Sequence, residues 1–169
     1  MTDVGLMSYY LGLEVKQMED GIFISQESYT KEILKKFNML DCNPMNTPME
    51  SGTEFSKFDE GEKVDPTLFK SHVGSLRYLT CTRTNILYAV GVVSHFMEAP
   101  SSTHLKVARR ILRYLKGMTE FGLFYSSSND FNLMRYCDSD YRGDIYDRKR
   151  TTGFVFFLGD SVISWSSKK

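Results

Sequence analysis

With 169 residues, of which 41% are hydrophobic and 14% aromatic, the chain can bury a real core in one domain or two small ones. Its formal net charge of zero excludes a global basic field, so any affinity for nucleic acid must come from local charge clusters. The three cysteines, Cys42, Cys81 and Cys137, form no C-x-x-C pair, which argues against a zinc knuckle or a redox motif. The sequence shows neither a signal-peptide pattern nor an apolar stretch long enough for a bilayer, so we expect an intracellular protein without membrane attachment.

The first elements are two short β-prone runs, residues 9–15 and 22–25. Asp20-Gly21 between them favours a hairpin, because glycine tolerates the positive φ of a tight turn. Ser25 can cap a following helix, and Asn38 is a suitable stop. The apolar residues on one face of this helix are Tyr29, Ile33, Leu34 and Phe37. The sequence therefore predicts a hairpin and a helix in residues 1–49, followed by an exposed polar linker in residues 50–65.

Three segments between residues 66 and 118 repeat apolar residues at helical spacing. Asp65 and Pro66 are a good cap and first-turn pair for the first helix, and Pro100 ends the second. The third begins near Ser101 or Ser102 and stops at Gly117. The three apolar stripes are Phe69, Val73, Leu76 and Leu79; Ile86, Val90, Val93 and Met97; and Leu105, Ala108, Leu112 and Leu115. Packing the three helices together would bury all three stripes, which predicts a three-helix bundle.

After Gly117 the hydrophobic period falls towards two. Four runs are typical of strands: residues 122–125, 131–137, 153–158 and 162–165. The charged stretch between Asp138 and Arg150 predicts a long exposed loop. We therefore expect antiparallel strands in residues 119–169 and, for the whole chain, an α+β fold.

The third predicted helix carries Lys106, Arg109, Arg110, Arg113 and Lys116 and no acidic residue. Steps of three and four place these cations on a face opposite the leucines. Such a row suits the phosphates of a duplex backbone, which select for charge and position and not for base sequence. The alternative is an ordinary solvated helix face, although solvated faces usually mix both signs of charge.

Asp138 ends a predicted strand and is the candidate metal ligand. Metal-dependent phosphodiester hydrolysis needs several carboxylates on rigid elements, about 4 Å from paired ions. Asp140, Asp144 and Asp147 follow it, but in a stretch that also holds four basic residues. A mixed-charge surface loop accounts for these three, and the role of Asp138 stays open between a structural residue and a ligand.

Seven short sequence blocks stand in a characteristic order along the chain. They are Tyr10-Leu-Gly-Leu-Glu-Val15, Gly21-Ile-Phe-Ile-Ser-Gln26, Pro44-Met-Asn-Thr-Pro-Met49, Val73-Gly-Ser-Leu-Arg-Tyr-Leu-Thr80, Arg110-Ile-Leu-Arg-Tyr-Leu-Lys-Gly117, Tyr136-Cys-Asp-Ser-Asp140 and Ile163-Ser-Trp-Ser-Ser-Lys168. In this order they resemble the Pol polyproteins of copia-type retrotransposons, and the resemblance covers essentially the whole chain.

The resemblance implies a role for each part. Residues 9–26 look like the hairpin at the palm edge of a reverse transcriptase, which supports the primer end. The helices between residues 66 and 117 look like the thumb, which holds the template–primer duplex. Residues 131–169 look like the first three strands of a ribonuclease H fold, and Asp138 matches that family's first metal-binding aspartate.

The departures from the family pattern bear on activity. The polymerase needs the aspartates of a Tyr-x-Asp-Asp hairpin, and no such pair occurs here. The ribonuclease H site needs a glutamate and further acids that this sequence does not supply. In addition, Thr84-Asn85 stands where Pro-Asp is usual, and Tyr141-Arg142 where Trp-Ala is usual.

We therefore expect a truncated piece of such a polyprotein that is catalytically inactive alone. It needs no cofactor of its own, whereas the parent family uses Mg²⁺. Its expected partner is a nucleic-acid duplex, bound weakly through the cations of the third helix. Two alternatives remain: a ribonuclease H-type nuclease acting through Asp138 and Asp140, and a protein-interaction module without nucleic-acid binding. The incomplete sheet also predicts self-association through an open strand edge.

Overall fold

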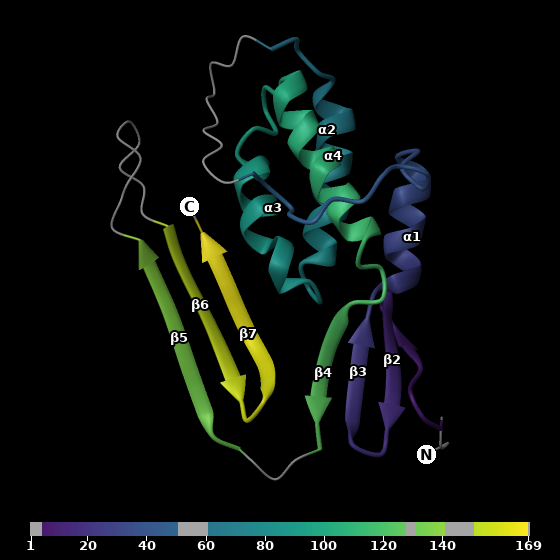
Figure 1. Ribbon diagram of the computed structural model, residues 1–169, viewed down its shortest axis with the longest axis vertical. Coiled ribbons are helices and arrows are strands. Elements are labelled where there is room, and N and C mark those ends of the chain that lie inside the picture. The colour runs from purple at the N-terminus through teal and green to yellow at the C-terminus, as the bar shows by residue number, and fades with distance from the viewer. Residues whose placement is uncertain (1–4, 51–60, 128–130, 141–150, 169) are drawn as a thin grey trace. The chain divides into compact units, whose positions relative to one another are not determined.

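The computed structural model of the chain describes residues 5–50, 61–127, 131–140 and 151–168 (Figure 1). Its helices are α1 (Glu27–Lys36), α2 (Pro66–Leu79), the 3₁₀ turn η1 (Thr84–Ile86), α3 (Leu87–Ser94) and α4 (Ser102–Lys116). Its strands are β1 (Tyr9–Tyr10), β2 (Leu13–Met18), β3 (Gly21–Ser25), β4 (Gly122–Ser126), β5 (Leu133–Asp140), β6 (Thr151–Leu158) and β7 (Ser161–Lys168). Helices and antiparallel sheets in one chain confirm the predicted α+β class.

The chain divides into two compact units. A helical unit spans residues 28–119, and a β unit combines residues 1–27 with residues 120–169. The helical segment is therefore inserted between the two parts of the β unit. The exposed loop predicted between Asp138 and Arg150 begins too early, because β5 continues to Asp140. The rest of that stretch, residues 141–150, and most of the predicted linker lie outside the described residues.

The helical unit holds the hydrophobic core. Among the described residues, every buried hydrophobic side chain lies between Ile33 and Leu115. The predicted stripes of α2 and α4 are buried, apart from Leu105, which is half-buried against the core. Helix α1 contributes Ile33 and Leu34 to the same core, so four helices share it and not only the three between residues 66 and 118.

Local capping sets the ends of two of these helices. The side chain of Asp65 accepts a 2.9 Å hydrogen bond from the backbone N–H of Thr67, with Pro66 in the first turn of α2. At the start of α4, the Ser101 backbone N–H donates to Nδ1 of His104 at 3.0 Å, while the Ser101 hydroxyl accepts from the His104 N–H. This is a capping box with histidine in place of the usual glutamate.

Helix α3 is shorter than its apolar repeat predicts, because it ends at Ser94 and leaves Met97 beyond it. The Ser94 hydroxyl donates a 2.7 Å hydrogen bond to the Val90 carbonyl. A side chain that bonds back to the helix in this way competes with the backbone ladder and favours an end or a bend.

The predicted hairpin is present as β2 and β3, which pair antiparallel with Met18 opposite Gly21. The run 9–15 is not one strand, however. Leu11 and Gly12 have φ angles of 47° and 80° and turn the chain, so that β1 folds back on β2. A leucine with positive φ is uncommon, so Leu11 did not indicate the turn, and the one signal, the glycine at position 12 within the run, was missed.

Strand β4 pairs antiparallel with β3, with Ile24 opposite Leu123, and completes a sheet of order β1-β2-β3-β4 (Figure 1). The sequence grouped this strand with the C-terminal strands, because hydrophobic period alone does not reveal a partner on the far side of the helical segment. Gly122 allows the close approach, since a Cβ there would lie 2.3 Å from the Ile24 carbonyl oxygen.

The C-terminal strands form a second antiparallel sheet of order β5-β6-β7. Asp138 on β5 lies opposite Gly153 on β6. The pairing of β6 with β7 has a register shift between Phe156 and Phe157. Within the described ranges, none of the helices is long and apolar enough to cross a membrane.

Candidate nucleic-acid interface

The five predicted cations of α4 differ in exposure. Lys106 and Arg109 are exposed, whereas Arg110, Arg113 and Lys116 are half-buried. Helix α4 contains no Asp or Glu, so no carboxylate within the helix neutralises them. The buried residues of α4 lie on its other side and include Ala108, Ile111, Leu112 and Leu115.

Residues 42–50, which we call the strap, account for the burial of the last two cations. The Lys116 Nζ donates a 2.6 Å hydrogen bond to the carbonyl of Cys42, and the Arg113 Nε donates at 2.7 Å to the carbonyl of Asn43. In return, the Met45 backbone N–H donates to the Arg113 carbonyl at 3.3 Å. Backbone carbonyls thus occupy two donors that the sequence assigned to phosphates.

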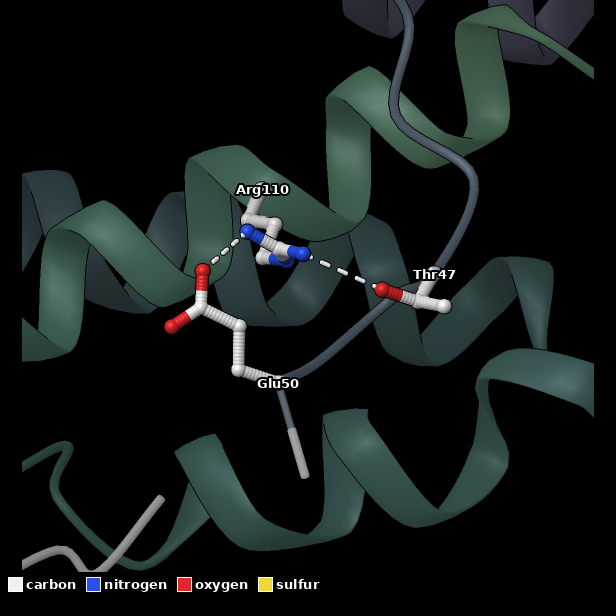
Figure 2. Close-up of polar contacts among 3 residues, drawn as sticks. All are labelled: Thr47, Glu50 and Arg110. Atoms are coloured by element: carbon white, nitrogen blue, oxygen red, sulfur yellow. Dashed lines mark hydrogen bonds and ion pairs between the residues drawn. The ribbon is translucent and has the colours of Figure 1, made fainter. Parts of the chain in front are cut away.

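Arg110 binds the other end of the strap, as Figure 2 shows. Its Nη1 lies 2.5 Å from a carboxylate oxygen of Glu50, and its Nη2 donates at 3.1 Å to the hydroxyl of Thr47. The side chain of Glu50 is 68% exposed, against 20% for Arg110. An ion pair that is open to water on the acidic side contributes little to stability, because solvent competes for both charges.

Lys36 on α1 and Arg109 on α4 both act on a buried histidine of α2. His72 of α2 is buried, its Nδ1 lies 2.9 Å from the Leu68 carbonyl, and its ring stacks on Phe37. Burial lowers the pKa of His72, the hydrogen bond with Leu68 opposes this, and the charges of Arg109 and Lys36 lower the pKa further. Both cations therefore act on the same imidazole. The sequence prediction missed Lys36, because α1 was not expected to share a core with the helices between residues 66 and 118.

Asp138 is exposed on β5, and its partner position on β6 is a glycine without a side chain. The part of the chain that the structure describes has no group of three or more His, Cys, Asp or Glu residues that could hold a metal ion. Asp144 and Asp147 lie outside the described residues, as does the side chain of Asp140. The assignment of Asp138 as a metal ligand therefore stays a prediction.

Known proteins with similar sequences identify the family. The chain is 41% identical over its whole length to the uncharacterized mitochondrial protein AtMg00810 of Arabidopsis thaliana and covers 70% of that protein. It is 40% identical over 96% of its length to the retrovirus-related Pol polyprotein from transposon RE1 of the same plant. The Pol polyprotein from transposon TNT 1-94 of Nicotiana tabacum is 37% identical over 99% of the chain. The chain belongs to the copia-type retrotransposon Pol family.

Only a part of a copia-type Pol polyprotein corresponds to this chain. It spans 11% of the RE1 polyprotein and 13% of the TNT 1-94 polyprotein. Residues 1–51 match the family described as reverse transcriptase (RNA-dependent DNA polymerase), a match that covers β1 to α1 and the strap. No solved structure matches the chain.

Proposed function

We propose that this copia-type Pol segment binds the backbone of a nucleic-acid duplex, RNA–DNA or DNA, weakly and without sequence preference. The observation that supports this is the pair of exposed cations, Lys106 and Arg109, on a helix without acidic residues. Lys36, which acts on the same imidazole as Arg109, adds a third positive charge. Three phosphate contacts would give a log–log salt slope of about −2.7, at about −0.9 per contact on duplex DNA.

We also propose that the 169-residue chain does not itself polymerise or hydrolyse nucleic acid. In the family this chemistry needs paired aspartates in the palm and several carboxylates in the ribonuclease H site, where they bind Mg²⁺. The sequence contains no two adjacent aspartates. Incubation with an RNA–DNA hybrid and Mg²⁺ or Mn²⁺ should leave both strands intact. Cleavage that disappears in Asp138→Asn would instead support the nuclease alternative.

The binding proposal is tested by fluorescence anisotropy with a labelled 20-base-pair duplex over a range of salt. The double variant Lys106→Gln/Arg109→Gln should bind more weakly, and its salt slope should be flatter by about two. Lys70→Gln/Arg77→Gln is the matched control, because it removes one exposed lysine and one exposed arginine from α2. Equal losses in both double variants would show that only net charge matters. No binding by the unmodified chain would overturn the proposal.

A further inference from the structure

We infer that Glu50 competes with the phosphates of a bound duplex for Arg110, so that the strap restrains the α4 interface. This inference rests on the proposed function, because the competing ligand is a phosphate backbone. Arg110 would be a third α4 contact that becomes available when Glu50 moves away. The exposed pair, Lys106 and Arg109, would make the first contacts.

Arg110 already binds two oxygen acceptors of the strap. Its two terminal nitrogens hold two separate oxygen acceptors, one from Glu50 and one from Thr47 (Figure 2). A phosphate offers oxygens that match the planar fork of arginine, and it carries a full negative charge. The strap thus presents Arg110 with two oxygen acceptors and one negative charge in total, as a backbone phosphate would.

Glu50 and Arg110 differ in their exposure to water. Glu50 is the acidic residue of residues 42–50, and its side chain is largely in water, whereas Arg110 is mostly covered. Exchange therefore involves a rotation of the Glu50 side chain away from Arg110. Surface ion pairs of this kind are weak and are screened by salt.

Other contacts hold the strap against α4 and the core. Arg113 and Lys116 bind backbone carbonyls of Asn43 and Cys42, and the side chains of Cys42 and Met49 pack against the core. These contacts hold the strap on α4 whether or not Glu50 is paired. They hold one donor each of Arg113 and Lys116, whereas Glu50 contacts Arg110, so the competition with Glu50 concerns Arg110.

The experiment is anisotropy with the same 20-base-pair duplex on a set of single substitutions. Glu50→Gln should raise the affinity about 3- to 10-fold at low salt and steepen the log–log salt slope by about 0.9, the value for one added contact. Glu98→Gln is the control, because it removes one exposed acid elsewhere in the helical unit. Thr47→Ala frees Nη2 without changing the charge, and it should raise the affinity by a smaller factor.

Arg110→Gln completes a double-mutant cycle with Glu50→Gln. The affinity gain should vanish when Arg110 is already absent, beyond the small charge effect seen in Glu98→Gln. Thermal unfolding followed by circular dichroism checks that each variant is folded. If the unmodified chain binds but Glu50→Gln gains no more than Glu98→Gln, the inference is wrong and the proposed function stands. If no variant binds the duplex, both are overturned.

Discussion

The guanidinium of Arg83 donates a 2.6 Å hydrogen bond from Nη2 to the backbone carbonyl of Thr119, 36 residues further along the chain. Its Nη1 donates to the neighbouring carbonyl of Met118. The side chain of Arg83 is 1% exposed, so a charge is buried where α4 ends. The C-terminal end of a helix carries partial negative charge, which makes it a favourable place for a buried cation.

Arg83→Met should therefore lower the free energy of unfolding by about 2–5 kcal/mol, because it leaves two partly covered carbonyls without a donor. Arg77→Met on the exposed side of α2 is the control and should change it by less than about 0.5 kcal/mol. Urea unfolding followed by circular dichroism at 222 nm measures both. Equal effects from the two substitutions would show that Arg83 contributes no more than a surface arginine.

Gly122→Ala tests the pairing of β4 with β3. A Cβ at Gly122 would lie 2.3 Å from the Ile24 carbonyl oxygen, so the strands must separate and lose ladder hydrogen bonds. We expect a loss of about 1–3 kcal/mol, the range for overpacking in a closely packed site. Gly74→Ala on α2 is the matched control. A Cβ there meets nothing within 4 Å, so alanine should stabilise the helix by about 0.5–1 kcal/mol.

Fast hydrogen exchange at β3 amides in Gly122→Ala, with α2 and α4 unchanged, would confirm that the substitution acts on this sheet. If both glycine substitutions stabilise the chain equally, β4 does not approach β3 as closely as the structure shows.

The helices could be predicted because their signals are local. Asp65-Pro66 starts α2 and Ser101 starts α4, each from contacts within three residues. The place of β4 could not be predicted, because pairing with β3 depends on where the helical unit brings the chain back. The turn at Leu11 and Gly12 was missed, because its conformation is unusual for leucine and the glycine beside it was not read as a turn.

For the five cations of α4, the sequence revealed the residues but not their partners. The residues and their common helix followed from spacing alone. The partners of Arg110, Arg113 and Lys116 could not be predicted in this way. Arg113 and Lys116 bind backbone carbonyls, which every residue has. The third involves Glu50, which is 60 residues away from Arg110 in the chain. Charge patterning within a helix cannot reveal a partner at that distance.

The stability of the helical unit should fall as the pH drops below about 6.5. That is the ordinary pKa of histidine, and burial together with the nearby Arg109 and Lys36 lowers the pKa of His72 in the folded state. Above pH 6.5 His72 is neutral in both states. Below pH 6.5 the unfolded chain takes up a proton at His72 that the folded chain resists. The free energy of unfolding therefore falls by up to about 1.4 kcal/mol per pH unit, until the pH reaches the pKa of His72 in the folded state.

Urea unfolding at pH 7.5, 6.5 and 5.5 measures this effect. His72→Gln should flatten the pH dependence over this range, whatever its effect on stability at pH 7.5. His95→Gln is the control, because His95 is exposed. An unchanged slope in His72→Gln would assign the pH dependence to other groups.

Hydrogen exchange should show much slower amides in α2 and α4 than in β5–β7. Among the described residues, all buried hydrophobic side chains belong to the helical unit, and none belongs to the β unit. Instead, large side chains of the C-terminal sheet remain exposed, such as Leu133 at 65% and Tyr136 at 58%. Burying such a side chain contributes about 1.5–3 kcal/mol, so each exposed one forgoes a sizeable part of the ~5–15 kcal/mol that stabilises a domain.

We expect protection factors in β5–β7 at least about 100-fold below those of α2 and α4, which corresponds to about 2.7 kcal/mol of opening free energy. Exchange measured at two protein concentrations, tenfold apart, separates two explanations of the opposite result. Protection in β5–β7 that rises with concentration would mean that a second copy covers the sheet, as the outer position of β5 among the described strands favours. Equal and concentration-independent protection would mean that the sheet is stable without a buried hydrophobic face, and the prediction would be wrong.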